Sequence, residues 1–236
     1  NLSDAADPAA SVRMLRQYSV DGVIVASSTL PTSFAKSFKT ANLPVVHAFG
    51  RHSAAPDVDV VGIDNVACGS MAAETLLRRA YKRVAFLGGP ETATSTQDRA
   101  EGFVKTLNRS RDVTVSLSYA SDDSFDAGRA EMQRLLASGP AEAYFCGDDL
   151  LAVGALCAIG EAGLSVPHDI GLIGLNDMAM SRLQNIGLTT IRQPVAEIIE
   201  SAIERVVGLI ATPASPPESR LFPCAVIERR TLPQLI

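Results

Sequence analysis

The stretch AYFCGDDLLAVGALCAIGEAGLSVPHDIGLIGL (residues 143–175) decides the fold class of this chain. It predicts a short strand at 143–146, a helix over 148–162 and a second strand at 170–175. The second strand is apolar on both faces, which is typical of a parallel strand covered by helices on both sides. The segment therefore indicates a strand–helix–strand unit with parallel strands.

The same alternation extends outward along the whole chain. Further strands are predicted at 22–26, 44–48, 58–63, 83–88, 113–119, 188–191 and 222–228, and further helices near 8–18, 31–41, 65–80, 95–108, 124–138 and 194–210. A Pro/Ser-rich loop is expected at 211–219. The pattern predicts an α/β fold built from doubly wound parallel sheets.

Composition narrows the classes of function. The chain has 236 residues, is 47% hydrophobic and carries a net charge of -5, which suits one large or two small globular domains. That charge has the wrong sign for a surface that binds nucleic acid by itself. The four cysteines form no CxxC pair, and the first residues lack the features of a signal peptide, so a cytoplasmic protein is expected if the natural start is present.

Several chemistries lack their motifs. His47, His52 and His168 are far apart in sequence, so nothing indicates a metal site. There is no GxSxG elbow, and Gly88-Gly89-Pro90 matches neither common phosphate-binding pattern, which makes a strand-ending turn the better interpretation. We therefore expect no enzyme, no metal and no cofactor.

Polar side chains follow the predicted strands, at the edge where parallel sheets bind ligands. The candidate ligand-binding residues are Ser27, Asp64, Ser95, Arg99, Asp123, Asp148 and Asn176. Helix N-capping is an alternative role for Asp64, Asp122, Asp177 and one of the pair Asp148/Asp149. Two adjacent carboxylates cannot share one cap, which leaves the other of the pair freer to face a ligand. Arg99 lies near a helix start, where a cation opposes the helix dipole, so it needs either Asp98 or a ligand to compensate it.

The motifs VDGVIV (20–25), RVAFLGGP (83–90), DRAEGF (98–103), GLSVPHDIGLIGLNDM (163–178) and LTTIRQP (188–194) occur in an order that resembles the effector-binding core of the lactose-repressor (LacI/GalR) family. The resemblance implies two periplasmic-binding-protein-like lobes, a small sugar-like effector in the cleft between them, and a homodimer. It also implies a helix-turn-helix head that binds operator DNA and is not part of this sequence. A periplasmic sugar-binding protein of a transporter is the alternative, because it shares the fold.

The family pattern also gives the candidate residues their roles. Arg99 matches the effector-contacting arginine of the family's RxxGF helix, and Asp148 and Asn176 stand where the family often has Asn and Asp. Ser95 and Asp123 match cleft-lining positions, whereas Gln193 matches the segment that crosses between the lobes. Together these residues predict a neutral polyhydroxylated ligand.

The resemblance divides the chain into four parts. We expect residues 1–84 to form the N-terminal lobe, without its first strand–helix–strand, and residues 85–190 to form the C-terminal lobe. Residues 191–215 would cross back with a helix to the N-terminal lobe, and residues 216–236 would form the final strand region and the C-terminus.

Overall fold

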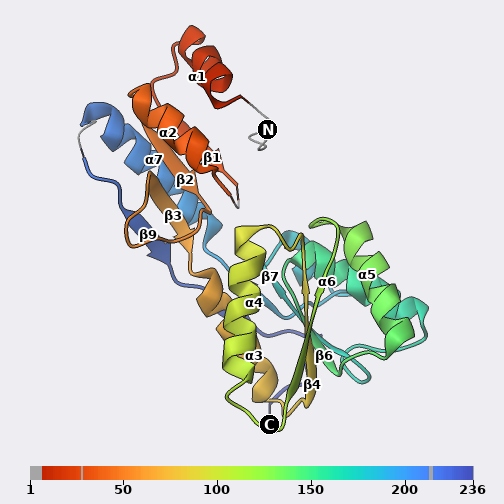
Figure 1. The fold of residues 1–236 in the computed structure, drawn as a ribbon. Helices are drawn as coiled ribbons and strands as arrows, with labels where there is room; N and C mark the ends of the chain where they lie inside the picture. The colour runs from red at the N-terminus through yellow and green to blue at the C-terminus, as the bar shows by residue number, and fades with distance from the viewer. Residues whose placement is uncertain (1–6, 28, 213–214, 236) are drawn as a thin grey trace. The chain divides into compact units, whose positions relative to one another are not determined.

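The computed structural model describes residues 7–27, 29–212 and 215–235. The chain folds into two compact units (Figure 1). Unit 1 comprises Asn1–Asp64 and Pro194–Pro223, and unit 2 comprises Asn65–Gln193 and Cys224–Ile236. No helix in the described ranges is long and apolar enough to cross a membrane.

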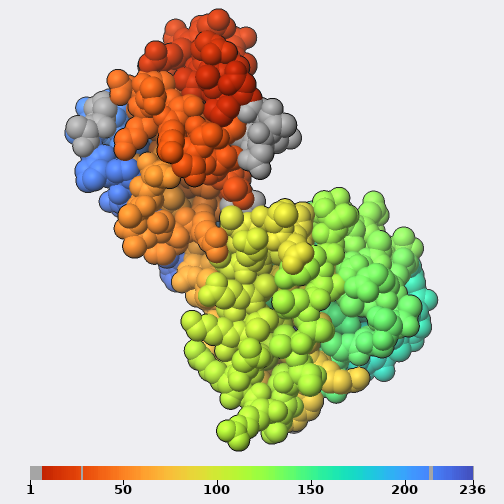
Figure 2. All heavy atoms as spheres, viewed as in Figure 1, coloured from red at the N-terminus to blue at the C-terminus, as the bar shows by residue number. Residues whose placement is uncertain are grey.

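Unit 1 is built on a four-stranded sheet. Its strands are β1 (Val23–Ala26), β2 (Val45–Ala48), β3 (Asp59–Ile63) and β9 (Ser219–Phe222), in the order β1-β2-β3-β9, and neighbouring strands are parallel. Its helices are α1 (Pro8–Gln17), α2 (Thr32–Thr40) and α7 (Val195–Ala211). Helices α1 and α2 contribute to the red and orange surface of this unit in Figure 2.

Helices α2 and α7 cover opposite faces of the unit 1 sheet (Figure 1). Phe34 and Phe38 of α2 pack with Val25 and Val45 in one buried cluster. Helix α7 contacts β1, β2 and β3 through a buried stripe that includes Ile198. The sequence predicts a single apolar stripe at i, i+3, i+4, i+7 spacing, namely Val195, Ile198, Ile199, Ala202, Val206 and Ile210. The structure divides it: Ile198, Ala202 and Val206 are buried, and an exposed apolar stripe is formed by Val195, Ile199, Ile203, Val207 and Ile210.

Unit 2 is built on a six-stranded sheet in the order β10-β8-β7-β6-β4-β5. Its elements in chain order are α3 (Asn65–Leu77), β4 (Arg83–Gly88), α4 (Thr94–Leu107), β5 (Thr114–Tyr119), α5 (Phe125–Ser138), β6 (Ala143–Cys146), α6 (Asp149–Glu161), β7 (Gly171–Leu175), the short 3-10 helix η1 (Ala179–Arg182), β8 (Thr190–Arg192) and β10 (Ala225–Ile227). All neighbouring strands are parallel except β10, which runs antiparallel to β8.

Helices cover both faces of the unit 2 sheet, with α3 and α4 on one side and α5 and α6 on the other (Figure 1). On the α4 side, Phe86, Phe103 and Phe145 are fully buried, and their ring centroids lie 5.3–6.3 Å apart. This arrangement confirms the predicted α/β fold with parallel sheets.

The predicted helices agree with the observed ones within three residues at each end, but the C-terminal region differs. In place of one strand at 222–228 there are two, β9 and β10, which belong to different sheets. Pro223 separates them, and proline cannot donate to a strand ladder. Residue 219 was predicted to end the loop at 211–219, but Ser219–Phe222 form strand β9.

The division into units also differs from the predicted boundaries. The first boundary falls at 64/65 rather than 84/85, because α3 packs on α4 and thus belongs to unit 2. The next falls at 193/194 rather than 190/191, and the final strand region is shared between the two units.

Candidate functional site

The carboxyl edge of the unit 2 sheet carries the main cluster of candidate residues. Strand β4 ends in Gly88-Gly89 and lies between β5 and β6 in the sheet. The loop after β5 supplies Asp123, and the loop after β6 supplies Asp148. Asn176 follows β7, and Gln193 follows β8. Four strand ends thus present polar side chains on the edge where open parallel sheets bind ligands.

Arg99 is held in this site by α4. Its Nε donates to Asn65 Oδ1 at 2.8 Å, and its Nη1 donates to the Gly147 carbonyl at 2.7 Å. Burial lowers the pKa of Arg99, but the neighbouring Asp148 and Asp123 oppose that shift. An arginine stays protonated at neutral pH under these conditions, so the site retains one full positive charge.

Close packing of α3 on α4 fixes the position of Arg99. A Cβ on Gly69 would lie 2.1 Å from the Arg99 carbonyl oxygen, and a Cβ on Gly102 would lie 1.9 Å from the Val66 carbonyl oxygen. Glycine is therefore required at both crossing points. The positive charge of Arg99 is unfavourable near the start of a helix. The Gly147 carbonyl and the Asn65 amide oxygen, both in unit 2, compensate it.

A chain of hydrogen bonds links three further residues. Asp148 caps α6, since its Oδ1 accepts from the Leu150 amide at 2.7 Å. Its Oδ2 accepts from Asn176 Nδ2 at 2.6 Å, and Asn176 Oδ1 accepts in turn from Gln193 Nε2. Burial raises the pKa of Asp148 to about 6, with smaller contributions in the same direction from Asp123 and Asp149.

The roles of the two adjacent carboxylates differ from the sequence argument. The capping residue was expected to leave its neighbour free for a ligand, yet the capping Asp148 is the partly exposed one. Asp149 is completely buried and accepts from Thr190 Oγ1, Ser181 Oγ and the Met178 amide at 2.6–2.8 Å. Asp149 thus holds the loops after β7 and before β8 in place, and it stabilises the candidate site from within the core of unit 2.

Asp123 is exposed and lies against the end of β4. A Cβ built on Gly89 would lie 1.9 Å from Asp123 Oδ1, so only glycine leaves room for this carboxylate. Burial raises the pKa of Asp123, while Arg99 lowers it. Ser95 lies in the first turn of α4 and is half-buried.

The remaining two candidates, Ser27 and Asp64, belong to unit 1. Ser27 Oγ donates to the Thr29 carbonyl at 2.8 Å, and His47 Nε2 lies 2.9 Å from the Ser27 carbonyl oxygen. His47 is buried, and burial lowers its pKa. Asp64 is exposed between β3 and α3. A role for Ser27 and Asp64 in ligand binding stays a prediction.

Asp177 does not cap a helix, which corrects the expectation for this residue. It is buried and accepts from Arg192 Nε and Arg229 Nη2, both at 2.6 Å, and from Arg182 Nη2 at 3.2 Å. Burial opposes its ionisation, but the arginines overcome that effect and hold the pKa of Asp177 below its ordinary value. These ion pairs connect β8 to the C-terminal segment that contains Arg229.

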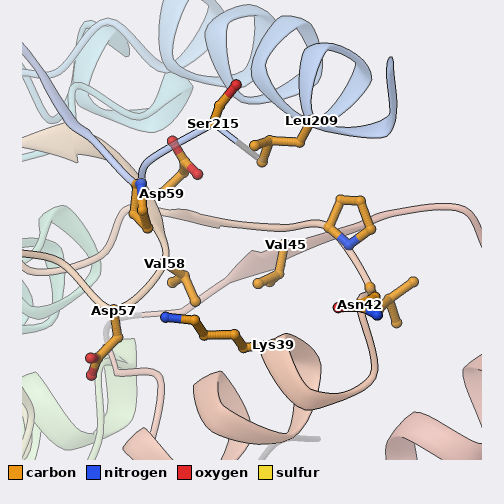
Figure 3. Close-up of a pocket in the computed structure, with 11 residues that line it drawn as sticks. Lys39, Asn42, Val45, Asp57, Val58, Asp59, Leu209 and Ser215 are labelled. Atoms are coloured by element: carbon orange, nitrogen blue, oxygen red, sulfur yellow. The ribbon is translucent and has the colours of Figure 1, made fainter. Parts of the chain in front are cut away.

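Unit 1 contains a separate cavity of about 260 Å³ (Figure 3). Lys39 of α2, Val45 of β2, Val58 before β3 and Leu209 of α7 are among its lining residues. These strands begin at the cavity, so it lies at the amino edge of the sheet. Ligands of open parallel sheets bind at the opposite edge, and this cavity is therefore not the candidate effector site.

Within the described residues, no group of three or more His, Cys, Asp or Glu side chains is placed to hold a metal ion. The polar set of unit 2 consists instead of an arginine, carboxylates and amides. Such groups bind hydroxyls, amines and other hydrogen-bonding groups of small organic molecules. The fold and this set define a ligand-binding α/β protein.

Comparison with known proteins agrees with that class. Residues 73–232 match the model of the periplasmic binding protein-like domain, and the chain belongs to that family. More particularly, the chain is homologous to the effector-binding core of LacI-family transcription regulators. The resemblance seen in the sequence is thus confirmed.

Individual relatives support this assignment. The chain is 32% identical over 228 residues to the HTH-type transcriptional repressor PurR of Escherichia coli O1:K1, covering 94% of this chain and 66% of the relative's length. A LacI family transcriptional regulator from Enterococcus faecium with bound ribose is 25% identical, with a TM-score of 0.85 over 98% of this chain and 86% of that chain. A regulatory protein of LacI family from Chloroflexus aggregans is 26% identical, with a TM-score of 0.84 over 98% of this chain and 84% of that chain.

Gln193 was assigned to the crossing segment because it matches that segment of the family pattern. It is the last residue of unit 2 before the chain crosses to unit 1, and its side chain also donates to Asn176. Asn65, which accepts the Arg99 hydrogen bond, was not among the seven candidate ligand-binding residues. The signal for both residues was their position, since each lies two residues after a predicted strand (58–63 and 188–191).

Proposed function

We propose that this chain is the effector-sensing core of a LacI-type transcription regulator. The observation that carries the proposal is the linked polar set Asp148–Asn176–Gln193, together with Arg99, at the carboxyl edge of the unit 2 sheet. These groups come from separate strand ends, so one small molecule bound there contacts several loops at once. That is the arrangement by which a bound ligand changes the conformation of a sensor.

The proposed effector is a small sugar-like molecule. Arginine and carboxylate groups bind vicinal hydroxyls bidentately, and Asn176 supplies both a donor and an acceptor. The Enterococcus faecium relative, whose structure contains ribose, supports this ligand class. We propose further that the second unit closes over the ligand and that the protein acts as a homodimer.

The operator DNA would be bound by a helix-turn-helix head in the longer protein. The chain spans 66% of the length of the PurR relatives, and the HTH in their names refers to whole proteins. The alternative is a solute-binding protein of a transporter. The sequence matches to repressors favour the regulator, because they extend over 94% of this chain.

The test is a thermal-shift screen against sugars, polyols, nucleosides and sugar acids, followed by calorimetry of the best hit. A ligand that binds only the folded state raises its melting temperature. Gln193→Ala should lower the affinity about 10-fold or more, since it removes one polar contact and releases Asn176. The matched control is Gln97→Ala on the exposed face of α4. Unchanged affinity in Gln193→Ala would contradict the assignment of the site.

A further inference from the structure

The unit 1 cavity has an apolar floor (Figure 3). Four apolar side chains that line it come from the turn after α2, from β2, from the segment before β3 and from α7. Each of the four is buried, with an exposed fraction of only 6–8%: Leu43, Val45, Val58 and Leu209. These side chains therefore pack inside unit 1 and also border a space that a ligand can enter.

The polar residues that line the cavity differ in whether their side chains are already bonded. Asp59 is bonded, because its Oδ1 accepts from Arg205 Nε at 2.5 Å. Lys39, Asn42 and Asp57 are exposed, and their side chains form no hydrogen bond or ion pair with any residue that the structure describes. Among the described residues, the cavity is thus bordered by one unpaired cation and one unpaired carboxylate.

The walls of the cavity are formed by the protein alone. Pro44 and Pro217 line it, and the proline ring fixes the backbone φ angle of each. In Figure 3 the Lys39 side chain extends toward Val58, so its amine lies on the side from which Asp57 comes. A group of each charge therefore borders the same apolar floor.

The size and charge of the cavity restrict its ligand. Its volume of about 260 Å³ is below the range of about 300–1,000 Å³ that is typical of pockets for drug-sized molecules, so it suits a smaller molecule. A ligand with a single charge is attracted by one of Lys39 and Asp57 and repelled by the other. A ligand with one charge of each sign is attracted by both, and an apolar body lets it cover the floor.

We propose that the unit 1 cavity binds a small zwitterion with an apolar body, namely an α-amino acid with a branched aliphatic side chain. Lys39 binds its carboxylate, and Asp57 binds its ammonium. The aliphatic side chain packs on the apolar floor. This second ligand site lies apart from the candidate effector site of unit 2 and does not depend on the proposed function.

The experiment is calorimetric titration of the chain with L-leucine, L-isoleucine and L-valine. Each is compared with the carboxylate and the amine of the same carbon skeleton, which for leucine are isocaproate and isoamylamine, and with glycine. The best branched amino acid should bind about threefold or more tightly than its singly charged analogues, because exposed ion pairs contribute modestly. It should bind at least about 30-fold more tightly than glycine, which lacks the apolar side chain.

Two variants assign the charged contacts. Lys39→Met keeps the aliphatic stem and removes the charge, so it should abolish the preference for the amino acid over the amine. Asp57→Asn should abolish the preference for the amino acid over the carboxylate. Lys36→Met changes an exposed lysine of α2 that does not line the cavity, and this control should leave every affinity unchanged. Circular dichroism verifies that each variant folds.

Three results would overturn the inference. The folded chain could bind none of the branched amino acids, or it could bind glycine as tightly as it binds them. Preferences that survive both Lys39→Met and Asp57→Asn would place the ligand outside this cavity. The proposed function would stand after any of these results, because it is tested with sugars and polyols and with a residue of unit 2.

Discussion

Unit 1 leaves more apolar surface exposed than unit 2, although it is the smaller of the two. Of the large hydrophobic side chains described as exposed, nine belong to unit 1 and four to unit 2. Unit 2 covers both faces of its sheet with helices, whereas five of the nine in unit 1 lie on one side of α7. Both units have a buried core, but among the described residues one side of α7 in unit 1 is left uncovered.

The exposed stripe of α7 borders the edge strand β1. A Cβ on Gly22, next to β1, would lie 3.1 Å from Ile210 Cδ1, and β1 is paired on one side only within the described sheet. An additional strand beside β1 and a helix beside α7 would bury this surface together. The strand–helix–strand element predicted from the family resemblance has that form, and its presence in the longer protein stays a prediction.

The largest effect should come from removing one core aromatic in each unit. Phe86→Ala in unit 2 and Phe34→Ala in unit 1 should each cost about 3–5 kcal/mol, because both rings are almost fully buried. Hydrogen exchange followed by mass spectrometry should show faster exchange in the mutated unit alone. Equal acceleration in both units after either change would show that the two units unfold as one, and the comparison would no longer hold.

Within unit 2, replacing each of the two adjacent carboxylates by alanine should lower the free energy of unfolding by different amounts. Asp149→Ala leaves two hydroxyls and an amide without their acceptor, which should cost about 3 kcal/mol. Asp148→Ala removes a helix cap and should cost about 1 kcal/mol. Urea unfolding monitored by far-UV circular dichroism measures both. The reverse order would mean that Asp149 is not the structural member of the pair.

Stability should depend on pH with opposite sign in the two units. The pKa of Asp148 is raised to about 6, so between its ordinary value and 6 the folded state binds more protons than the unfolded state. Unit 2 should therefore gain stability as the pH falls from 7 to 5. The pKa of His47 is lowered by burial, so the unfolded state takes up the proton first and unit 1 should lose stability below pH 6.5.

Hydrogen exchange at pH 5, 6 and 7, corrected for the intrinsic rate, measures this opposition. Asp148→Asn should reduce the gain in unit 2, where Asp123 and Asp149 also have raised pKa values. His47→Asn should flatten the loss in unit 1. A common slope in both units would argue against the assigned protonation states.

The smallest effect is expected on the exposed side of α7. Ile203→Ala and Val207→Ala should each change the free energy of unfolding by less than about 0.5 kcal/mol, since both side chains are about half exposed. Ile198→Ala, on the buried side of the same helix, should cost about 2–4 kcal/mol. Chemical denaturation compares them. A large loss for Ile203→Ala in this chain would show that the stripe is already covered.

The sequence predicted most of the fold because its periodic segments are long and apolar. Helix α7 shows both sides of this, since its apolar spacing predicted the helix but not its buried side: Ile198, Ala202 and Val206 are buried, whereas Val195, Ile199 and Ile210 of the same predicted stripe are exposed. Strand β9 was missed because SRLF is short and half-exposed, and its pairing with β3 comes from the other end of the chain. Long-range pairing of that kind leaves no local pattern.

The site was predictable to the level of strand ends and no further. That Asp148, Asn176 and Arg99 gather at one edge follows from parallel strands. Which carboxylate of Asp148 and Asp149 is buried depends on whether Ser181 and Thr190 reach it, and these residues lie more than 30 positions away. The contacts of Asp177 with three arginines could likewise not be predicted, because these arginines come from η1, β8 and the segment after β10.

The chain passes between the two units at three points, after Asp64, Gln193 and Pro223. Two of these passages begin or end with a side chain bonded to the proposed site: Asn65 receives Arg99, and Gln193 donates to Asn176. We expect a molecule that replaces either bond to change the backbone of that passage, because Asn65 and Gln193 are the residues next to the two crossings. A ligand that contacts unit 2 alone would thereby act on segments that connect it to unit 1, as the proposed sensing function requires.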